Sequence, residues 1–284
     1  MSYKIIECPR DAMQGMETFI PTEKKAAYIN KLLQVGFDTI DFGSFVSPKA
    51  IPQLRDTAEV LSLLDLSETK SKLLAIIANT RGAQDACQFE EIDYLGYPFS
   101  ISATFQKRNT NATIDQSLAR VEEIQNLSVK HKKEMVVYIS MAFGNPYGDA
   151  WSGELAAKWV DRLSSELGIK IFALADTVGM SNVQNIKELF DTIIPSFSGL
   201  EIGAHLHTTA EEAAAKVTAC IDAGCTRFDA AIMGYGGCPM AEDDLVGNLA
   251  TESLLDALQK QEKLGLNMDL FAEAMQVASI TFPN

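Results

Sequence analysis

This sequence of 284 residues has few histidines, no closely paired cysteines and no long apolar run. Its five cysteines, an odd number, are scattered without Cys-x-x-Cys spacing, which is typical of reduced thiols rather than a disulfide framework. No stretch is long and apolar enough for a membrane span, and no basic leader precedes one. We therefore expect a cytoplasmic protein without a membrane partner.

Basic residues are also scarce, with 24 Lys and Arg against 38 Asp and Glu and a formal net charge of -14. Nucleic acids and anionic membranes bind clustered positive charge, so neither is an expected partner of so acidic a chain. Apolar residues make up 47% of the sequence, which is enough for a large buried core.

Strand-like and helix-like segments alternate along the whole chain. We expect strands near residues 5–8, 39–42, 73–78, 99–103, 135–140, 169–174, 201–205 and 227–231. The expected helices lie near residues 22–35, 51–64, 82–89, 113–131, 152–167, 181–193, 210–223 and 245–263. Eight such units predict an α/β fold, a (β/α)8 TIM barrel forming a single domain over residues 1–284, with an extra helical segment from about residue 266. A doubly wound open sheet is the alternative, but no Gly-x-Gly-x-x-Gly turn follows the first strand.

In such a barrel the chemistry lies at the carboxyl ends of the strands. Many of the expected strands end in polar side chains. These are Arg10 and Asp11 after the first strand, Asp41 and Ser44 at the second, Asn79 at the third, Asp176 at the sixth, and His205 and His207 at the seventh.

His205 and His207 are two residues apart in an extended segment, so both side chains leave on one face. Asp11 ends the first strand, which neighbours the last strands in a closed barrel, and Asn248 would add an amide oxygen. These four residues predict a divalent metal site suited to Mg²⁺ or Mn²⁺, with Zn²⁺ or Co²⁺ as alternatives. A hydrogen-bonded pair of core histidines is the less favoured alternative, because two of only three histidines in the chain meet at one predicted strand end.

A glycine-rich segment, Gly234-Tyr-Gly-Gly-Cys-Pro239, follows the last expected strand. Its glycines permit positive φ angles and close backbone approach, which favours a loop that presents the Cys238 thiol for chemistry over a buried inert thiol. Arg10 either forms a salt bridge or contributes charge to the catalytic rim. Lys107 and Arg108 are read as a solvated pair or as a contact for a coenzyme phosphate.

Several segments of this chain resemble the 3-hydroxy-3-methylglutaryl-CoA lyases, which belong to a superfamily of metal-dependent TIM-barrel lyases and condensing enzymes. The matching segments are Pro9-Arg10-Asp11, Ser44-Phe45-Val46-Ser47-Pro48-Lys49, Gly144-Asn145-Pro146-Tyr147, Asp176-Thr177-Val178-Gly179, His205-Leu206-His207, the Gly-Gly-Cys-Pro loop and Gly247-Asn248-Leu249-Ala250-Thr251-Glu252.

The resemblance implies a divalent-metal-dependent carbon-carbon lyase that cleaves 3-hydroxy-3-methylglutaryl-CoA to acetyl-CoA and acetoacetate, and it favours a homodimer. It implies that Arg10 stabilises the enolate oxygen and that Cys238, on a mobile loop, helps to protonate the acetyl-CoA carbanion. The metal ligands would be Asp11, His205, His207 and Asn248, the other catalytic residues Asp41 and Asp176, and the substrate contacts Gln14, Ser44, Asn79, Lys107 and Asn145.

The sequence also departs from the family pattern near these residues. Asp41 stands where the family has Glu, Thr208 follows the second histidine in place of Asp or Asn, and Gly15-Met16-Glu17 replaces an Asn-Glu-Lys stretch. Ala12 and Ala175 replace glycines. These differences motivate a second hypothesis, a lyase or aldolase for a related 3-hydroxy acid or hydroxyacyl-CoA. A non-catalytic ligand-binding barrel is the third.

Overall fold

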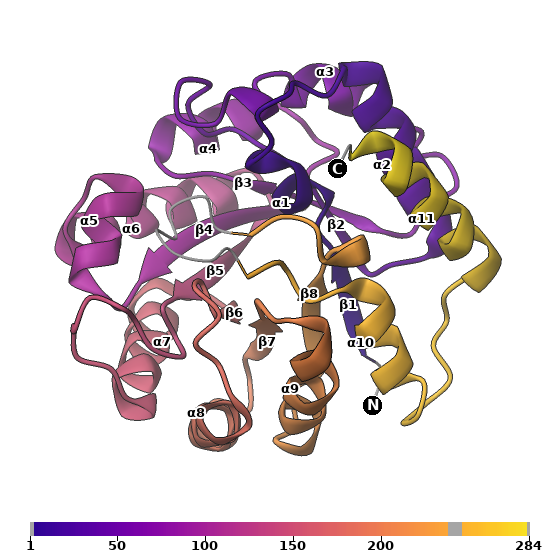
Figure 1. The fold of residues 1–284 in the computed structure, drawn as a ribbon. Coiled ribbons are helices and arrows are strands. Elements are labelled where there is room, and N and C mark those ends of the chain that lie inside the picture. Colours follow the sequence, from indigo (N-terminus) through magenta and orange to yellow (C-terminus); the bar gives the residue numbers. More distant parts are fainter. Residues whose placement is uncertain (1–2, 238–245, 283–284) are drawn as a thin grey trace.

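The computed structural model describes residues 3–237 and 246–282, and within them eight parallel strands form a closed barrel in sequence order (Figure 1). The predicted TIM barrel is therefore confirmed and the open-sheet alternative is wrong. The strands are β1 (Lys4–Glu7), β2 (Thr39–Ser44), β3 (Lys72–Ile76), β4 (Tyr94–Ser100), β5 (Glu134–Ser140), β6 (Ile171–Ala175), β7 (Glu201–His205) and β8 (Arg227–Ala230).

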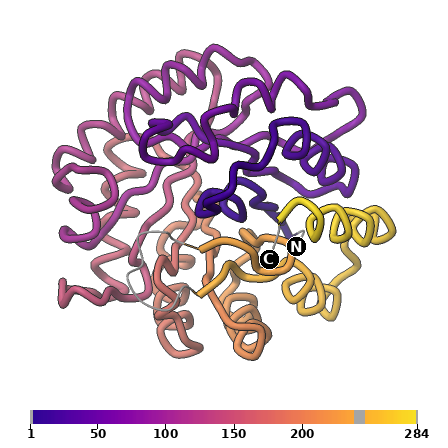
Figure 2. The backbone as a smooth tube through the Cα atoms, turned by 45° about the horizontal axis from the view of Figure 1, so that its top comes forward, coloured from indigo at the N-terminus to yellow at the C-terminus, as the bar shows by residue number. Residues whose placement is uncertain are grey.

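Helices surround this barrel and cover its outer face, apart from the short α1, which lies at the carboxyl ends of the strands (Figure 1). They are α1 (Pro9–Gln14), α2 (Thr22–Val35), α3 (Thr57–Ser62), α4 (Thr80–Ala86), α5 (Ala103–Thr110), α6 (Ile114–Lys130), α7 (Gly153–Leu167), α8 (Val183–Ser196), α9 (Ala210–Asp222), α10 (Thr251–Leu258) and α11 (Met268–Thr281), with short 3-10 turns η1 (Pro52–Leu54) and η2 (Ile232–Gly234). Helix α11 is the extra C-terminal helix, and it packs beside α2 (Figures 1 and 2).

The barrel closes because β1 pairs in parallel with both β2 and β8. Lys4 aligns with Arg227 and Glu7 with Ala230, while His205 of β7 aligns with Asp229 of β8. Closure therefore brings the end of the first strand to the ends of the last two strands.

The largest differences from the predicted elements surround β4. This strand begins at Tyr94 rather than near residue 99, and α5, directly after it, was not predicted. The early part of β4 contains Gly96 and Pro98, residues that normally argue against a strand. Gly96 is needed because a Cβ there would lie 3.1 Å from the Tyr138 ring and 2.5 Å from Ile76 Cδ1.

Apolar side chains fill two regions, a large one between the barrel and its helices and a smaller one inside the barrel. The interior cluster contains Leu74, Val136, Tyr138, Ile171 and Ala173. Within the described part of the chain, none of the helices combines the length and the apolar character that a bilayer span requires.

Candidate active site

A cavity of roughly 240 Å³ opens among the carboxyl ends of the strands. Arg10, Asp11, His205 and His207 contribute polar groups to its lining. The rest of the lining is largely apolar and includes Val46, Ala50, Ile51, Ile76, Ala78, Pro98 and Phe105. A small set of polar groups in a mainly apolar lining is the usual composition of a small-molecule site.

Asp11, His205 and His207 form a compact group of donor atoms in this cavity. One donor atom from each lies within 4.8 Å of the others, and His205 Nε2 is 3.6 Å from Asp11 Oδ2. The buried His207 Nε2 has no hydrogen-bond partner among the described residues. A buried imidazole nitrogen without a partner costs free energy unless something binds it, so this trio fits a divalent cation better than a hydrogen-bonded core pair.

The surroundings of the three side chains shift their pKa values in different directions. Burial acts to lower the pKa of His205, but hydrogen bonds and charges from Asp11 and Asp229 outweigh it and raise the pKa to about 10. For His207, burial and the charge of His205 lower the pKa to about 4. Burial acts to raise the pKa of Asp11, yet Arg10 and His205 hold it well below its usual value. A cation placed here would replace the positive charge that His205 carries between two carboxylates.

Backbone pairing places Asn248 beside the trio. It forms an isolated antiparallel bridge with His207, and the Thr208 and Leu249 amides donate to Gly247 O and Leu206 O. Its side-chain Nδ2 donates to Tyr235 O at 2.8 Å, which leaves the amide oxygen as the group available to a cation.

Glycines permit this close packing near Asn248. A Cβ on Gly236, which has φ +90°, would lie 2.4 Å from Asp11 O and 2.8 Å from Asn248 Nδ2. The close backbone approach expected of the glycine-rich segment is therefore present as far as residue 237. Cys238 itself lies outside the described residues.

Arg10 is held by acidic and amide groups from two elements. Its Nε and Nη2 donate to the Asp41 carboxylate at 3.0 and 2.5 Å, and its Nη1 donates to Asp11 Oδ1 at 2.8 Å and to Gln14 Oε1 at 3.0 Å. Burial raises the pKa of Asp41 to about 6 against the opposing effect of Arg10, so the pair remains charged at neutral pH. Arg10 thus both forms salt bridges and lines the cavity. The two predicted roles, a salt bridge and a charge at the catalytic rim, are therefore compatible.

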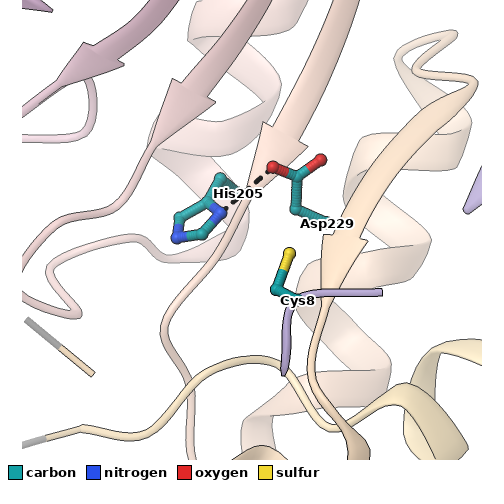
Figure 3. Close-up of side chains that lie close together, drawn as sticks. All are labelled: Cys8, His205 and Asp229. Atoms are coloured by element: carbon teal, nitrogen blue, oxygen red, sulfur yellow. Dashed lines mark hydrogen bonds and ion pairs between the residues drawn. The ribbon is translucent and has the colours of Figure 1, made fainter. Parts of the chain in front are cut away.

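Figure 3 shows the other side of His205, where its ring faces Asp229 and Cys8. His205 Nδ1 lies 3.2 Å from Asp229 Oδ2. Cys8 Sγ instead contacts Ile6 O at 3.7 Å, and burial followed by the nearby acidic charges raises the pKa of this thiol well above its usual value. Cys8 is therefore a neutral packing group, whereas Asp229 fixes the orientation of the His205 ring.

Sequence reasoning assigned no role to Glu7, which links three elements. Its carboxylate is fully buried and accepts hydrogen bonds from Ile232 N at 2.9 Å and Thr251 Oγ1 at 2.6 Å. These two residues flank the segment that contains Asn248. An ionisable residue ending a buried strand was a visible signal, but the sequence did not reveal its partners, which lie more than 220 positions away.

Of the predicted substrate contacts, only some line the cavity. Gln14 lines the cavity. Asn79 caps α4 through Gly82 N, Asn145 holds Tyr147 N and Asp149 N in its own loop, and Ser44 accepts from Val46 N. None of these three, nor the exposed Lys107, is among the residues lining the cavity.

Asp176 is buried at the end of β6. Its Oδ1 accepts from Ser181 N at 3.1 Å, whereas its Oδ2 has no partner among the described residues. Burial raises its pKa, which favours a neutral carboxyl group more than at an exposed site.

Comparisons with known proteins agree with this geometry. The family model described as HMGL-like matches residues 4–280. The chain is 32% identical over 257 residues to the hydroxymethylglutaryl-CoA lyase YngG of Bacillus subtilis, covering 89% of this chain and 84% of that protein. It is 30% identical over 271 residues to a 3-hydroxy-3-isohexenylglutaryl-CoA/hydroxy-methylglutaryl-CoA lyase of Pseudomonas aeruginosa, covering 94% and 88%.

Solved structures show the same likeness. An HMG-CoA lyase from Acinetobacter baumannii, in complex with coenzyme A and 3-methylmalate, superposes with a TM-score of 0.90 at 31% identity and covers 99% of this chain and 91% of that one. The Bacillus subtilis HMG-CoA lyase superposes with a TM-score of 0.91 at 30% identity, covering 98% and 93%. With a family model spanning nearly the whole barrel and the acid, histidine and arginine groups gathered at its mouth, this chain belongs to the HMGL-like family of lyases.

Proposed function

We propose that this protein is a divalent-metal-dependent carbon-carbon lyase that cleaves 3-hydroxy-3-methylglutaryl-CoA to acetyl-CoA and acetoacetate. The observation that carries the proposal is the Asp11, His205 and His207 trio beside Arg10 in one cavity, with His207 Nε2 lacking a partner among the described residues. The relatives named as HMG-CoA lyases support the same substrate.

Asp11, His205, His207 and Asn248 would hold the cation. One nitrogen pair and two oxygens suit Mg²⁺ or Mn²⁺, with Zn²⁺ or Co²⁺ as alternatives. When bound, the cation would acidify the substrate hydroxyl and polarise the ketone oxygen that forms from it.

The reaction breaks one carbon-carbon bond, with loss of the hydroxyl proton and formation of the acetyl-CoA enolate. Arg10 lies on the wall of the cavity and would offset the charge on the enolate oxygen, and Asp41 holds the guanidinium in place. Cys238 would supply the proton that converts the enolate to acetyl-CoA, so its thiol must be neutral beforehand. We also propose a catalytic role for Asp176, whose Oδ2 has no hydrogen-bond partner within residues 3–237 and 246–282.

The acyl-CoA substrate would make further contacts at the mouth of the barrel. The coenzyme A bound to the Acinetobacter baumannii lyase supports this class of substrate. Gln14 lines the cavity, and we propose contacts from Ser44, Asn79, Asn145 and Lys107, the last through a coenzyme phosphate. A homodimer and a cytoplasmic location stay predictions of the family resemblance and of the sequence.

A second candidate is cleavage of a related hydroxyacyl-CoA with a larger 3-substituent. The apolar wall formed by Val46, Ala50, Ile51 and Phe105 favours it, and the relative from Pseudomonas aeruginosa is named for such a substrate as well as for the methyl compound.

Purified protein should be stripped of metal and assayed with 3-hydroxy-3-methylglutaryl-CoA in Mg²⁺, Mn²⁺ and Co²⁺ separately. Acetoacetate formation with at least one ion supports the leading proposal, and no turnover with any of them rejects it. A panel of 3-alkyl homologues in the same assay decides between the two candidates through the ratio of kcat/KM values.

A further inference from the structure

A column of charged side chains runs through the interior of the barrel below the proposed metal site. Arg227 and Asp229 are two residues apart on β8, so they lie on one face of the strand, and His205 is aligned with Asp229 on β7. Arg227 Nη1 donates to Glu201 Oε1 at 3.1 Å, and Arg227 Nη2 lies 3.8 Å from Asp229 Oδ1. The interior of a TIM barrel is normally filled by branched apolar residues, so this column needs a reason.

The barrel is built to accommodate Arg227. Its neighbour across the strand pair is Gly203, and a Cβ there would lie 2.8 Å from both Cγ and Cδ of Arg227. A glycine within a strand weakens the strand and leaves no side chain to pack, so the arginine side chain occupies space that an apolar residue would otherwise fill.

Charge, more than hydrogen bonding, explains where Arg227 lies. The residue is 1% exposed, yet its Nε and Nη2 have no hydrogen-bond partner among the described residues, and neither does Asp229 Oδ1. A buried guanidinium is costly unless opposite charges compensate it. Glu201 at the amino end of the barrel and Asp229 nearer the site are two such charges, and Asp38 adds a weaker one.

Asp229 connects Arg227 to the proposed metal ligand His205. Its Oδ2 contacts His205 Nδ1 at 3.2 Å, while His205 Nε2 faces Asp11 (Figure 3 shows the His205 and Asp229 side chains). A carboxylate bound to one imidazole nitrogen fixes the ring so that the other nitrogen presents its lone pair to a cation. The position of Asp229 therefore determines the position of a proposed metal ligand.

We propose that Arg227 is a positioning residue for the metal site, which balances the charge of Asp229 and keeps its carboxylate against His205. This inference rests on the proposed metal-dependent function. Arg227 is not among the residues lining the cavity, and its link to His205 runs through Asp229.

The test measures Mn²⁺ binding by calorimetry on the purified full chain without substrate, so it does not depend on turnover. Arg227→Met keeps most of the side-chain volume and removes the charge. We expect it to weaken Mn²⁺ binding by roughly 10-fold, the lower end of the effect of losing a direct partner of a metal ligand, because Arg227 acts through such a partner. Glu201→Gln is the matched control, since it removes a different counter-charge of Arg227, together with the ion pair of Glu201 with Lys4, and leaves Asp229 paired. Its Mn²⁺ affinity should stay within about 2-fold of the parent.

Gly203→Ala carries the same test if Arg227→Met does not fold, because it displaces the arginine side chain without removing any polar group. We expect several-fold weaker Mn²⁺ binding. In either variant, labelling histidine with ¹⁵N gives a second readout, because the chain has only three histidines and the His205 Nδ1 signal is readily assigned. That signal should shift in the Arg227 and Gly203 variants and not in Glu201→Gln.

The experiment distinguishes an error in the proposed metal site from an error in the role of Arg227. If the parent protein binds no Mn²⁺, Mg²⁺, Zn²⁺ or Co²⁺, the proposed metal site is wrong and this inference falls with it. If the parent binds Mn²⁺ and a folded Arg227 or Gly203 variant binds it equally well, the metal site stands and the role of Arg227 is refuted.

Discussion

Arg10 and Asp41 form a buried ion pair in which Nη2 of the arginine lies 2.5 Å from Oδ2 of the aspartate. Asp41 is fully buried, and Arg10 is nearly so. Because the remaining donors of Arg10 reach Asp11 and Gln14, one guanidinium connects the β2 carboxylate to the proposed metal site.

Removing the charge of Asp41 should therefore destabilise the protein. We expect Asp41→Asn to lower the free energy of unfolding by about 3 kcal/mol or more, because it leaves a buried guanidinium without its main counter-charge. Urea denaturation measures this change. Glu166→Gln, which breaks the exposed pair with Arg162, is the control and should change stability by less than about 1 kcal/mol. Equal effects of the two substitutions would contradict the assignment.

The histidines give a direct test of the ligand set. His207→Ala should weaken Mn²⁺ binding by more than about 100-fold, since losing even an outer partner of a ligand costs about 10- to 100-fold. His131→Ala removes the exposed histidine that follows α6 and should leave the affinity unchanged. Calorimetric titration of both variants checks this prediction, and undiminished binding by His207→Ala would remove that residue from the site.

Glu7 should make stability depend on pH. Burial raises its pKa from 4.5 to about 8, against the hydrogen bonds from Thr251 and Ile232, and Glu252 adds to the rise. Tyr28 also faces Glu7, but its own pKa is raised far above this range. Because the folded state favours the neutral carboxyl group, the contribution of Glu7 is fully present below pH 4.5 and is lost as the pH rises towards 8.

The corresponding measurement compares unfolding free energies of the parent and Glu7→Gln across that range. The parent should lose on the order of a few kcal/mol more than the variant between low and high pH, because glutamine stays neutral throughout. Glutamine can still accept from Ile232 N and donate to Thr251 Oγ1, so the variant is expected to fold. Parallel pH profiles for the two proteins would show that Glu7 does not titrate in this range.

Cys238 is tested by separating chemistry from binding. Cys238→Ser should lower kcat by about 100-fold or more, the contribution typical of a positioned proton donor, while Mn²⁺ affinity stays unchanged. Cys87→Ser, at a buried cysteine on the outside of the barrel, should leave kcat within about 2-fold of the parent. A Cys238→Ser enzyme with the full rate would exclude the thiol from the proton transfer.

The fold was largely predictable because its signals are local. Alternating buried strands and amphipathic helices occur at a regular spacing, and β7 and α9 begin at the expected residues. The two histidines were assigned to one face by strand geometry alone, and the structure places both beside Asp11. Where the prediction was wrong, as for the start of β4, Gly96 discourages a strand locally but is required by the packed neighbours Ile76 and Tyr138, which the sequence does not reveal.

The supporting residues were harder to predict because their partners are distant in the sequence. Arg227 and Asp229 are visible as charges in a buried strand, but their relation to Glu201 and His205 follows from barrel closure and register. Asn79 was instead assigned a role that its position does not require. It was predicted to contact substrate because it ends a strand, but a polar residue there also serves well as a helix cap.

The proposed ligands come from the first unit of the barrel, Asp11, from its seventh strand, His205 and His207, and from the segment after the last strand, Asn248. No contiguous half of the chain contains all of them, so a half-barrel fragment cannot assemble the set. Cation binding would therefore report ring closure itself. In a folding experiment, Mn²⁺ affinity should develop only with the final cooperative step, later than the helix content that far-ultraviolet circular dichroism detects, and the ion should slow unfolding by holding the two chain-distant edges of the ring together.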